Sequence, residues 1–110
     1  MTENIIKEGK TLAIVSYLTL FGTIIAFFMN QDKKNEFTAF HTRQALGLWI
    51  LQMILGYVIG GFDNWNITLA FWIGISVLLF YGVLTAISGK VQPIPLLGDF
   101  FQKVFASLGK

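Results

Sequence analysis

The side chains with the most chemical potential lie between residues 35 and 44, in the stretch NEFTAFHTRQ, which holds the chain's only histidine and only arginine. On a helix of 3.6 residues per turn, spacings of three and four place Phe37, Phe40, His41 and Gln44 on one face. An imidazole titrates near neutral pH. One interpretation is therefore a polar seam that faces a groove, with His41 as a protonatable contact.

A second set of polar side chains stands inside otherwise apolar stretches, and its members are Gln52, Thr19, Thr23 and Ser76. A buried amide needs a hydrogen-bond partner, and hydroxyl groups at a similar depth would supply one. These four side chains would then form a polar cluster that orients the helices. The alternative places the same side chains on the wall of a pore.

Several kinds of catalytic and metal site are excluded. The chain has no cysteine, so it has no disulfide, no thiolate ligand and no thiol nucleophile. It has no phosphate-binding loop, no HExxH and no Gly-x-Ser-x-Gly, and its single histidine has no second histidine as a partner. We therefore expect no catalytic residue, no metal, no cofactor and no enzymatic activity.

The composition points to a lipid environment. Of the 110 residues, 55% are hydrophobic and 13% are charged, whereas soluble domains carry about 25% charged residues. Such a chain cannot cover a soluble globule with polar surface, so the bilayer must be its main solvent. The net charge of +2 is too small to indicate a nucleic-acid partner. We expect membrane lipids, other membrane subunits or a second copy as partners.

The apolar runs predict a single all-α domain over residues 1–110. Three transmembrane helices are expected, over about 11–29, 45–62 with an interfacial start at 37–44, and 65–87. After Pro93 and Pro95, apolar residues at helical spacing predict an amphipathic interfacial helix over about 96–108. Small residues four apart mark packing faces at Gly22 and Ala26, Gly56 and Gly60, and Gly82 and Ala86.

Three crossings would place the two chain ends on opposite sides of the membrane. One side would carry Lys7 and Lys10, and the other would carry Lys33, Lys34, Arg43, Lys90, Lys103 and Lys110. The excess of basic residues predicts that the second side is cytoplasmic, with the N-terminus outside and the C-terminus inside. Under this topology His41 and Arg43 have a second interpretation. They would mark where a helix leaves the headgroups, with Arg43 extended toward phosphate.

The stretches LAIVSYLTLFGTIIAF and NEFTAFHTRQALGLWI, together with the corner PLLG after the third apolar run, resemble small bacterial membrane proteins of the Tic-twenty-like family. This family is labelled "import component" for its similarity to a subunit of the chloroplast inner-envelope import translocon. The positions that match the family's motif are Phe37, Phe40, His41, Gln44, Pro95 and Gly98. The resemblance implies a bacterial inner-membrane location and a role in protein transport. The plastid protein has four predicted spans, against three spans and an interfacial helix here.

Three functions follow as hypotheses. The first is an accessory subunit of an inner-membrane complex that imports, inserts or assembles proteins. The second is a membrane-stress or peptide-tolerance protein that acts on the bilayer through the helix at 96–108 and the basic side. The third is a small homo-oligomeric channel lined by the second polar set.

Overall fold

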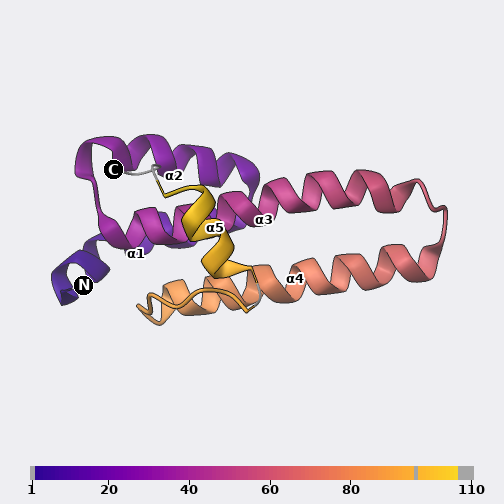
Figure 1. Cartoon of the computed structure of the whole chain (residues 1–110). Helices are drawn as coiled ribbons and strands as arrows, with labels where there is room; N and C mark the ends of the chain where they lie inside the picture. The colour runs from indigo at the N-terminus through magenta and orange to yellow at the C-terminus, as the bar shows by residue number, and fades with distance from the viewer. Residues whose placement is uncertain (1, 96, 107–110) are drawn as a thin grey trace.

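The computed structural model describes residues 2–95 and 97–106, and this part of the chain folds into helices without any strand (Figure 1). The all-α prediction is therefore confirmed. The helices are α1 (Glu3–Leu18), α2 (Leu20–Lys33), α3 (Glu36–Gly60), α4 (Trp65–Ile87) and α5 (Gly98–Val104).

The first apolar run does not form the continuous helix expected over residues 11–29. Thr19 adopts an extended backbone with φ −154° and ψ 167°, and its hydroxyl oxygen accepts a hydrogen bond from the Gly22 amide at 2.9 Å. This is the geometry of a helix N-cap, so a new helix begins at Leu20. A Cβ atom at Gly22 would overlap the Val15 carbonyl oxygen. The absence of a side chain there lets α2 fold back closely against α1.

α3 and α4 form a long helical hairpin. They contain 25 and 23 residues, about 37 and 35 Å at the usual rise, against a hydrocarbon core of about 30 Å. In the described part of the chain, these two helices are long and apolar enough to cross a membrane. The expected helix at 65–87 is confirmed with its bounds. The predicted segments at 37–44 and 45–62 form one continuous helix that ends at Gly60, and the three-span bundle is not confirmed.

The other helices gather around one end of this hairpin, while its far half extends alone (Figure 1). The ring of Tyr17 in α1 lies where a Cβ atom at Gly82 would be, and the ring of Phe101 in α5 lies where a Cβ atom at Gly47 would be. Residues 50–77 lie beyond these contacts, and we call them the outer half. Large apolar side chains are exposed along it, including Tyr57 and Trp65.

The core lies where α1, α3, α4, α5 and the segment after α4 meet. Its buried members are Ala13, Tyr17, Phe37, Ala45, Leu48, Ala86, Ile94 and Phe101. Two of the predicted small-residue faces serve packing here, since Gly22 and Ala26 are buried in α2 and Gly82 and Ala86 are buried in α4. Gly56 and Gly60 are not buried. They belong to the outer half.

α5 differs from the expected interfacial helix over 96–108. The described helix spans Gly98–Val104, and residues 96 and 107–110 lie outside the described part of the chain. Its Phe101 is buried against α3, and the Gln102 amide donates a hydrogen bond to the Phe40 carbonyl at 2.9 Å. The helix therefore docks on the protein through one face, while Phe100 and Val104 on its other side are exposed.

The first helix and the segment after α4 meet at the same end of the α3–α4 hairpin. The Asn35 amide donates to the Ile5 carbonyl at 2.9 Å, and the His41 ring contacts the Lys90 carbonyl at 2.9 Å. Asn35 and His41 both belong to the beginning of α3. Ile5 and Lys90 therefore lie at the same end of the hairpin, and both helices of spanning length stand between them in the sequence.

Candidate functional site

The predicted motif of α3 is buried where three parts of the chain meet. Phe37, His41 and Gln44 are fully buried, and Phe40 is almost so. The spacing of three and four on α3 points them toward α1 on one side and toward the segment after α4 on the other. The sequence therefore identified a true cluster, although its surroundings are those of a core.

The donor and the acceptor of each hydrogen bond in this cluster can be assigned. The Lys90 carbonyl only accepts, so the Nε2 atom of His41 must donate the 2.9 Å bond between them. The Nδ1 atom of His41 is then an acceptor, and the Tyr17 hydroxyl donates to it at 2.7 Å. The Gln44 amide in turn donates to the Tyr17 oxygen at 2.8 Å. These three bonds hold a neutral imidazole in a single tautomer.

Gln44 also fixes the chain after α4. Its side-chain oxygen accepts the Ile94 amide at 2.6 Å, so both ends of this buried side chain are used. Burial, partly offset by the hydrogen bond from Gln44, raises the pKa of the Tyr17 phenol, and the phenol keeps the proton that it donates to His41.

Three aromatic rings enclose the imidazole. The ring centroid of His41 lies 4.7 Å from that of Phe37, 5.1 Å from that of Phe40 and 5.5 Å from that of Tyr17, each in an edge-on arrangement. The groove-facing interpretation of His41 does not describe this position, because the protein itself covers the imidazole on every side. The interpretation that His41 marks the headgroup level stays a prediction.

The remaining motif residues lie around this cluster. The Arg43 guanidinium is half-buried and donates to the Gln102 side-chain oxygen at 3.3 Å, which links α3 to α5. Gly98 is buried, and a Cβ atom there would overlap Pro93. Pro95 is exposed, at a turn where the Gly98 amide bonds to the Ile94 carbonyl at 3.0 Å. Arg43 thus joins α5 to α3, and Gly98 packs against Pro93 in the segment after α4, whereas Pro95 does neither.

The second predicted set is not brought together. Thr23 is buried, and its hydroxyl donates to the Ser16 carbonyl at 2.5 Å within the α1–α2 hairpin. Ser76 is exposed on α4, and the described part of the chain shows no contact between α2 and α4. The Gln52 amide and the Phe71 ring both lie beside Gly56 instead. The pore wall proposed for these side chains is therefore not assembled within one copy of the chain.

Two asparagines that the sequence interpretation did not single out connect the first three helices. Asn30 and Asn35 exchange two hydrogen bonds, of 3.1 and 3.0 Å, across the turn between α2 and α3. Asn35 also caps α3 through the Thr38 amide at 3.0 Å. An asparagine before a glutamate and an apolar run is an N-cap signal, which could have identified Asn35. Tyr17, the missing member of the His41 cluster, had no comparable signal.

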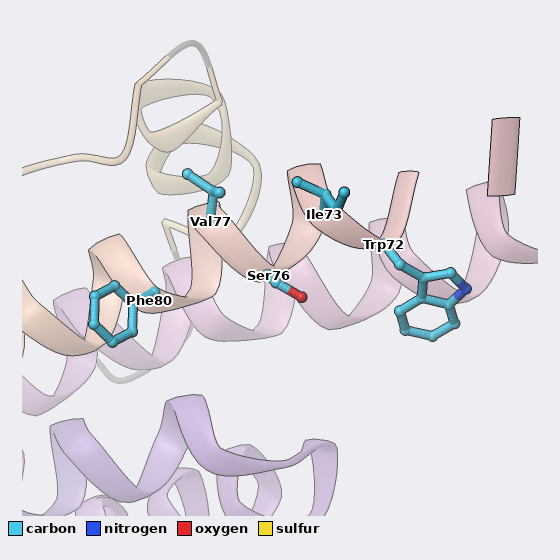
Figure 2. Close-up of a pocket in the computed structure, with 5 residues that line it drawn as sticks. All are labelled: Trp72, Ile73, Ser76, Val77 and Phe80. Atoms are coloured by element: carbon cyan, nitrogen blue, oxygen red, sulfur yellow. The ribbon is translucent and has the colours of Figure 1, made fainter. Parts of the chain in front are cut away.

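A shallow groove lies on α4, mostly within the outer half, and is shown in Figure 2. It has a volume of about 480 Å³ and is lined by Trp72, Ile73, Ser76, Val77 and Phe80. Trp72, Ser76 and Phe80 follow one another at intervals of four residues, so the small serine lies between two large rings. In the described residues, no group of histidine and acidic side chains is placed to hold a metal ion.

The geometry thus contains one buried polar cluster and one exposed apolar groove. Comparison with protein-family models, with curated proteins and with solved structures gives no match to this chain.

Proposed function

We propose that this chain is a non-enzymatic, multi-pass membrane protein that serves as an accessory subunit of a larger membrane assembly. α3 and α4 are its crossing helices. The resemblance of the α3 motif and the Pro95 to Gly98 corner to the Tic-twenty-like family suggests the kind of assembly, one that imports, inserts or assembles proteins in a bacterial inner membrane.

The observation that carries this proposal is the division between polar and apolar groups. The polar side chains of the α3 motif serve the packing of the chain itself, as the bonds among Tyr17, His41 and Gln44 illustrate. The outer half, in contrast, leaves large side chains uncovered, with Tyr57 at 87% exposure. This division supports a role through contact with lipid and with other membrane helices rather than through chemistry.

The groove on α4 is the proposed contact for a partner helix. In lipid, helices associate where a small residue permits close approach and larger neighbours interdigitate. Ser76 between Trp72 and Phe80 offers this arrangement (Figure 2). The proposed occupant is an apolar transmembrane helix of another subunit.

Charge supports an orientation different from the one expected above. Between Arg43 and Lys90 the sequence carries a single charged residue, Asp63, in the turn between α3 and α4. Every lysine and arginine of the described chain lies outside this interval. By the positive-inside rule, both described chain ends then face the cytoplasm and the turn faces the other side.

A photocrosslinking amino acid placed in living cells tests the subunit role. Val77 lines the groove and is 61% exposed, while Val58 on α3 is 51% exposed and does not line it. The proposal predicts a discrete adduct with another protein at position 77 and only lipid adducts at position 58. Lipid adducts or self-dimers alone at both positions would reject a partner subunit. Protein adducts at both positions would reject the groove as the docking site.

A further inference from the structure

The helix α2 carries an uncovered apolar face that the proposed subunit role does not use. Its exposed large side chains are Phe21, Ile24, Ile25, Phe28 and Met29. They recur at intervals of three and four and so form one stripe. The opposite face of α2 is buried against α1 and α3 through Gly22, Thr23 and Ala26. α2 therefore packs on the protein with its small residues and presents its large ones outward.

The α1–α2 hairpin is too short to cross a bilayer. α2 contains 14 residues, about 21 Å at the usual rise, against a hydrocarbon core of about 30 Å. Both open ends of the hairpin are bound to the beginning of α3, since Asn35 bonds to the Ile5 carbonyl and to the Asn30 side chain. The first helix and the second helix of the hairpin therefore begin and end, respectively, at the same depth, beside the beginning of α3.

Its tip reaches part of the way along α4. Tyr17, one residue before the end of α1, contacts α4 at Gly82. This glycine lies about 8 Å from the end of α4 at Ile87, by the rise of a helix. In Figure 1, α1 and α2 accordingly cover one end of the α3–α4 hairpin, and the outer half continues without them.

The polar groups exposed by the helix break are satisfied within the tip. The Thr19 hydroxyl accepts the Gly22 amide, and the Thr23 hydroxyl donates to the Ser16 carbonyl at 2.5 Å and lies 3.2 Å from the Thr19 carbonyl. Hydrocarbon tolerates an interrupted helix only where its backbone groups find such partners. The tip is therefore built for an environment without water.

The open end of the hairpin carries the charged side chains that the apolar tip lacks. The basic ones are Lys7, Lys10, Lys33 and Lys34, and the acidic ones are Glu3, Glu8, Asp32 and Glu36. These charges balance, and side chains of this kind belong at the headgroup level rather than in hydrocarbon. The residues between Lys10 and Met29 carry no charge.

A cavity beside α2 provides room for an acyl chain. It has a volume of about 250 Å³, lies between α2 and α3, and is lined by Thr23, Ile24, Phe27, Phe28, Thr42 and Leu46. The Thr42 hydroxyl is buried there and has no hydrogen-bond partner in the described part of the chain. This hydroxyl lies beneath the accessible wall of the cavity, and that wall is apolar, as an acyl chain requires.

We infer that α1–α2 is a re-entrant hairpin that inserts into a single leaflet, on the side of both chain ends, and that its partner is the lipid of that leaflet. The helices α1 to α4, with α5 beside them, then lie on this side, and only α3 and α4 continue into the other leaflet, so the protein has at least about twice the cross-section on one side. Such a wedge favours membranes in which its wide leaflet is convex. The inference rests on the proposed crossing of α3 and α4 but needs no partner subunit.

The purified full-length protein, added to a mixture of small and large vesicles of phosphatidylcholine and phosphatidylglycerol, tests this wedge. We expect severalfold more protein per unit of lipid on the small vesicles. Phe21→Ser with Phe28→Ser should abolish the preference, because it makes the α2 stripe polar without touching the core. Tyr57→Ser with Phe62→Ser removes aromatic rings from the narrow end and should preserve it. Equal density of the unaltered protein on both vesicle sizes would reject the wedge.

A fluorophore on Ile25→Cys tests the insertion itself, since the chain has no other cysteine. Lipids brominated on their acyl chains should quench this fluorophore strongly and should quench one on Asp32→Cys much less. A water-exposed fluorophore at position 25 would overturn the inference. Because these vesicles contain no other protein, either failure is distinguishable from the absence of a crosslinked partner in cells.

Discussion

The phenol oxygen of Tyr17 in α1 lies 2.7 Å from Nδ1 of His41 in α3. Through this bond and the one from His41 to the Lys90 carbonyl, a single buried imidazole holds the N-terminal hairpin and the C-terminal segment on the same stretch of α3. The motif that suggested a functional site in the sequence thus acts as the anchor of the fold.

Tyr17→Phe should destabilise the protein by about 1–3 kcal/mol, because it leaves Nδ1 of His41 and the Gln44 amide buried without a partner. Tyr57→Phe removes the same hydroxyl from an exposed side chain and should change the stability by about 0.5 kcal/mol or less. Denaturant unfolding of both variants in mild detergent measures the difference. Equal effects would show that the Tyr17 bond contributes nothing.

Gln44→Met should release the segment after α4. The substitution keeps the length of the side chain but removes the oxygen that accepts the Ile94 amide, at a cost of about 1–3 kcal/mol for the buried groups left unpaired. Hydrogen exchange at the Ile94 amide should accelerate severalfold. Gln52→Met, in the outer half, is the control and should leave that exchange rate unchanged. Unaltered exchange in Gln44→Met would contradict the bridging role of Gln44.

Gly47→Ala should loosen the docking of α5. A Cβ atom at this position would overlap the Phe101 ring, so the ring must move, at a cost of about 1–3 kcal/mol. Tryptic cleavage after Lys103 should become faster as α5 detaches. Gly60→Ala places a methyl group in open space on the same helix and should leave the cleavage rate as it is. Equal rates in the two variants would show that α5 is not held at Gly47.

Asn35→Ala should cost more than the loss of an ordinary helix cap. Asn35 caps α3 and also bonds to the Ile5 carbonyl, so we expect about 2–3 kcal/mol from the cap and the added bond. Asn64 caps α4 from an exposed position, and Asn64→Ala should cost about 1 kcal/mol. Thermal unfolding of both variants checks the order. A larger loss of stability in Asn64→Ala than in Asn35→Ala would show that Asn35 does not link α1 to α3.

The long helices were predictable because their signal is local. The run from Trp65 to Ile87 is predominantly apolar and carries no charge, and its bounds follow from Asn64 before it and Ser88 after it. The break at Thr19 was not predictable from hydropathy, since residues 11–29 carry no charge and no proline. There the Thr19 and Thr23 hydroxyls compete for backbone groups, and the close approach at Gly22 makes the folded-back arrangement possible.

The candidate site was predictable only in part. Helical spacing correctly placed Phe37, His41 and Gln44 on one face, because periodicity determines which side chains share a face. It does not determine what covers that face. Tyr17 and the carbonyl of Lys90 complete the cluster, and both come from segments whose positions depend on the tertiary fold.

The measurement that tests the account most directly is the labelling of single cysteines in intact spheroplasts with a maleimide that does not cross membranes. Thr2→Cys, Gln31→Cys and Asn64→Cys report on the start of the first helix, the end of α2 and the α3–α4 turn. With α3 and α4 as the crossing helices, position 64 should react from outside, and positions 2 and 31 should react only after permeabilisation. Outside labelling at position 2 with protection at position 31 would instead establish a crossing by residues 11–29 and would contradict the account.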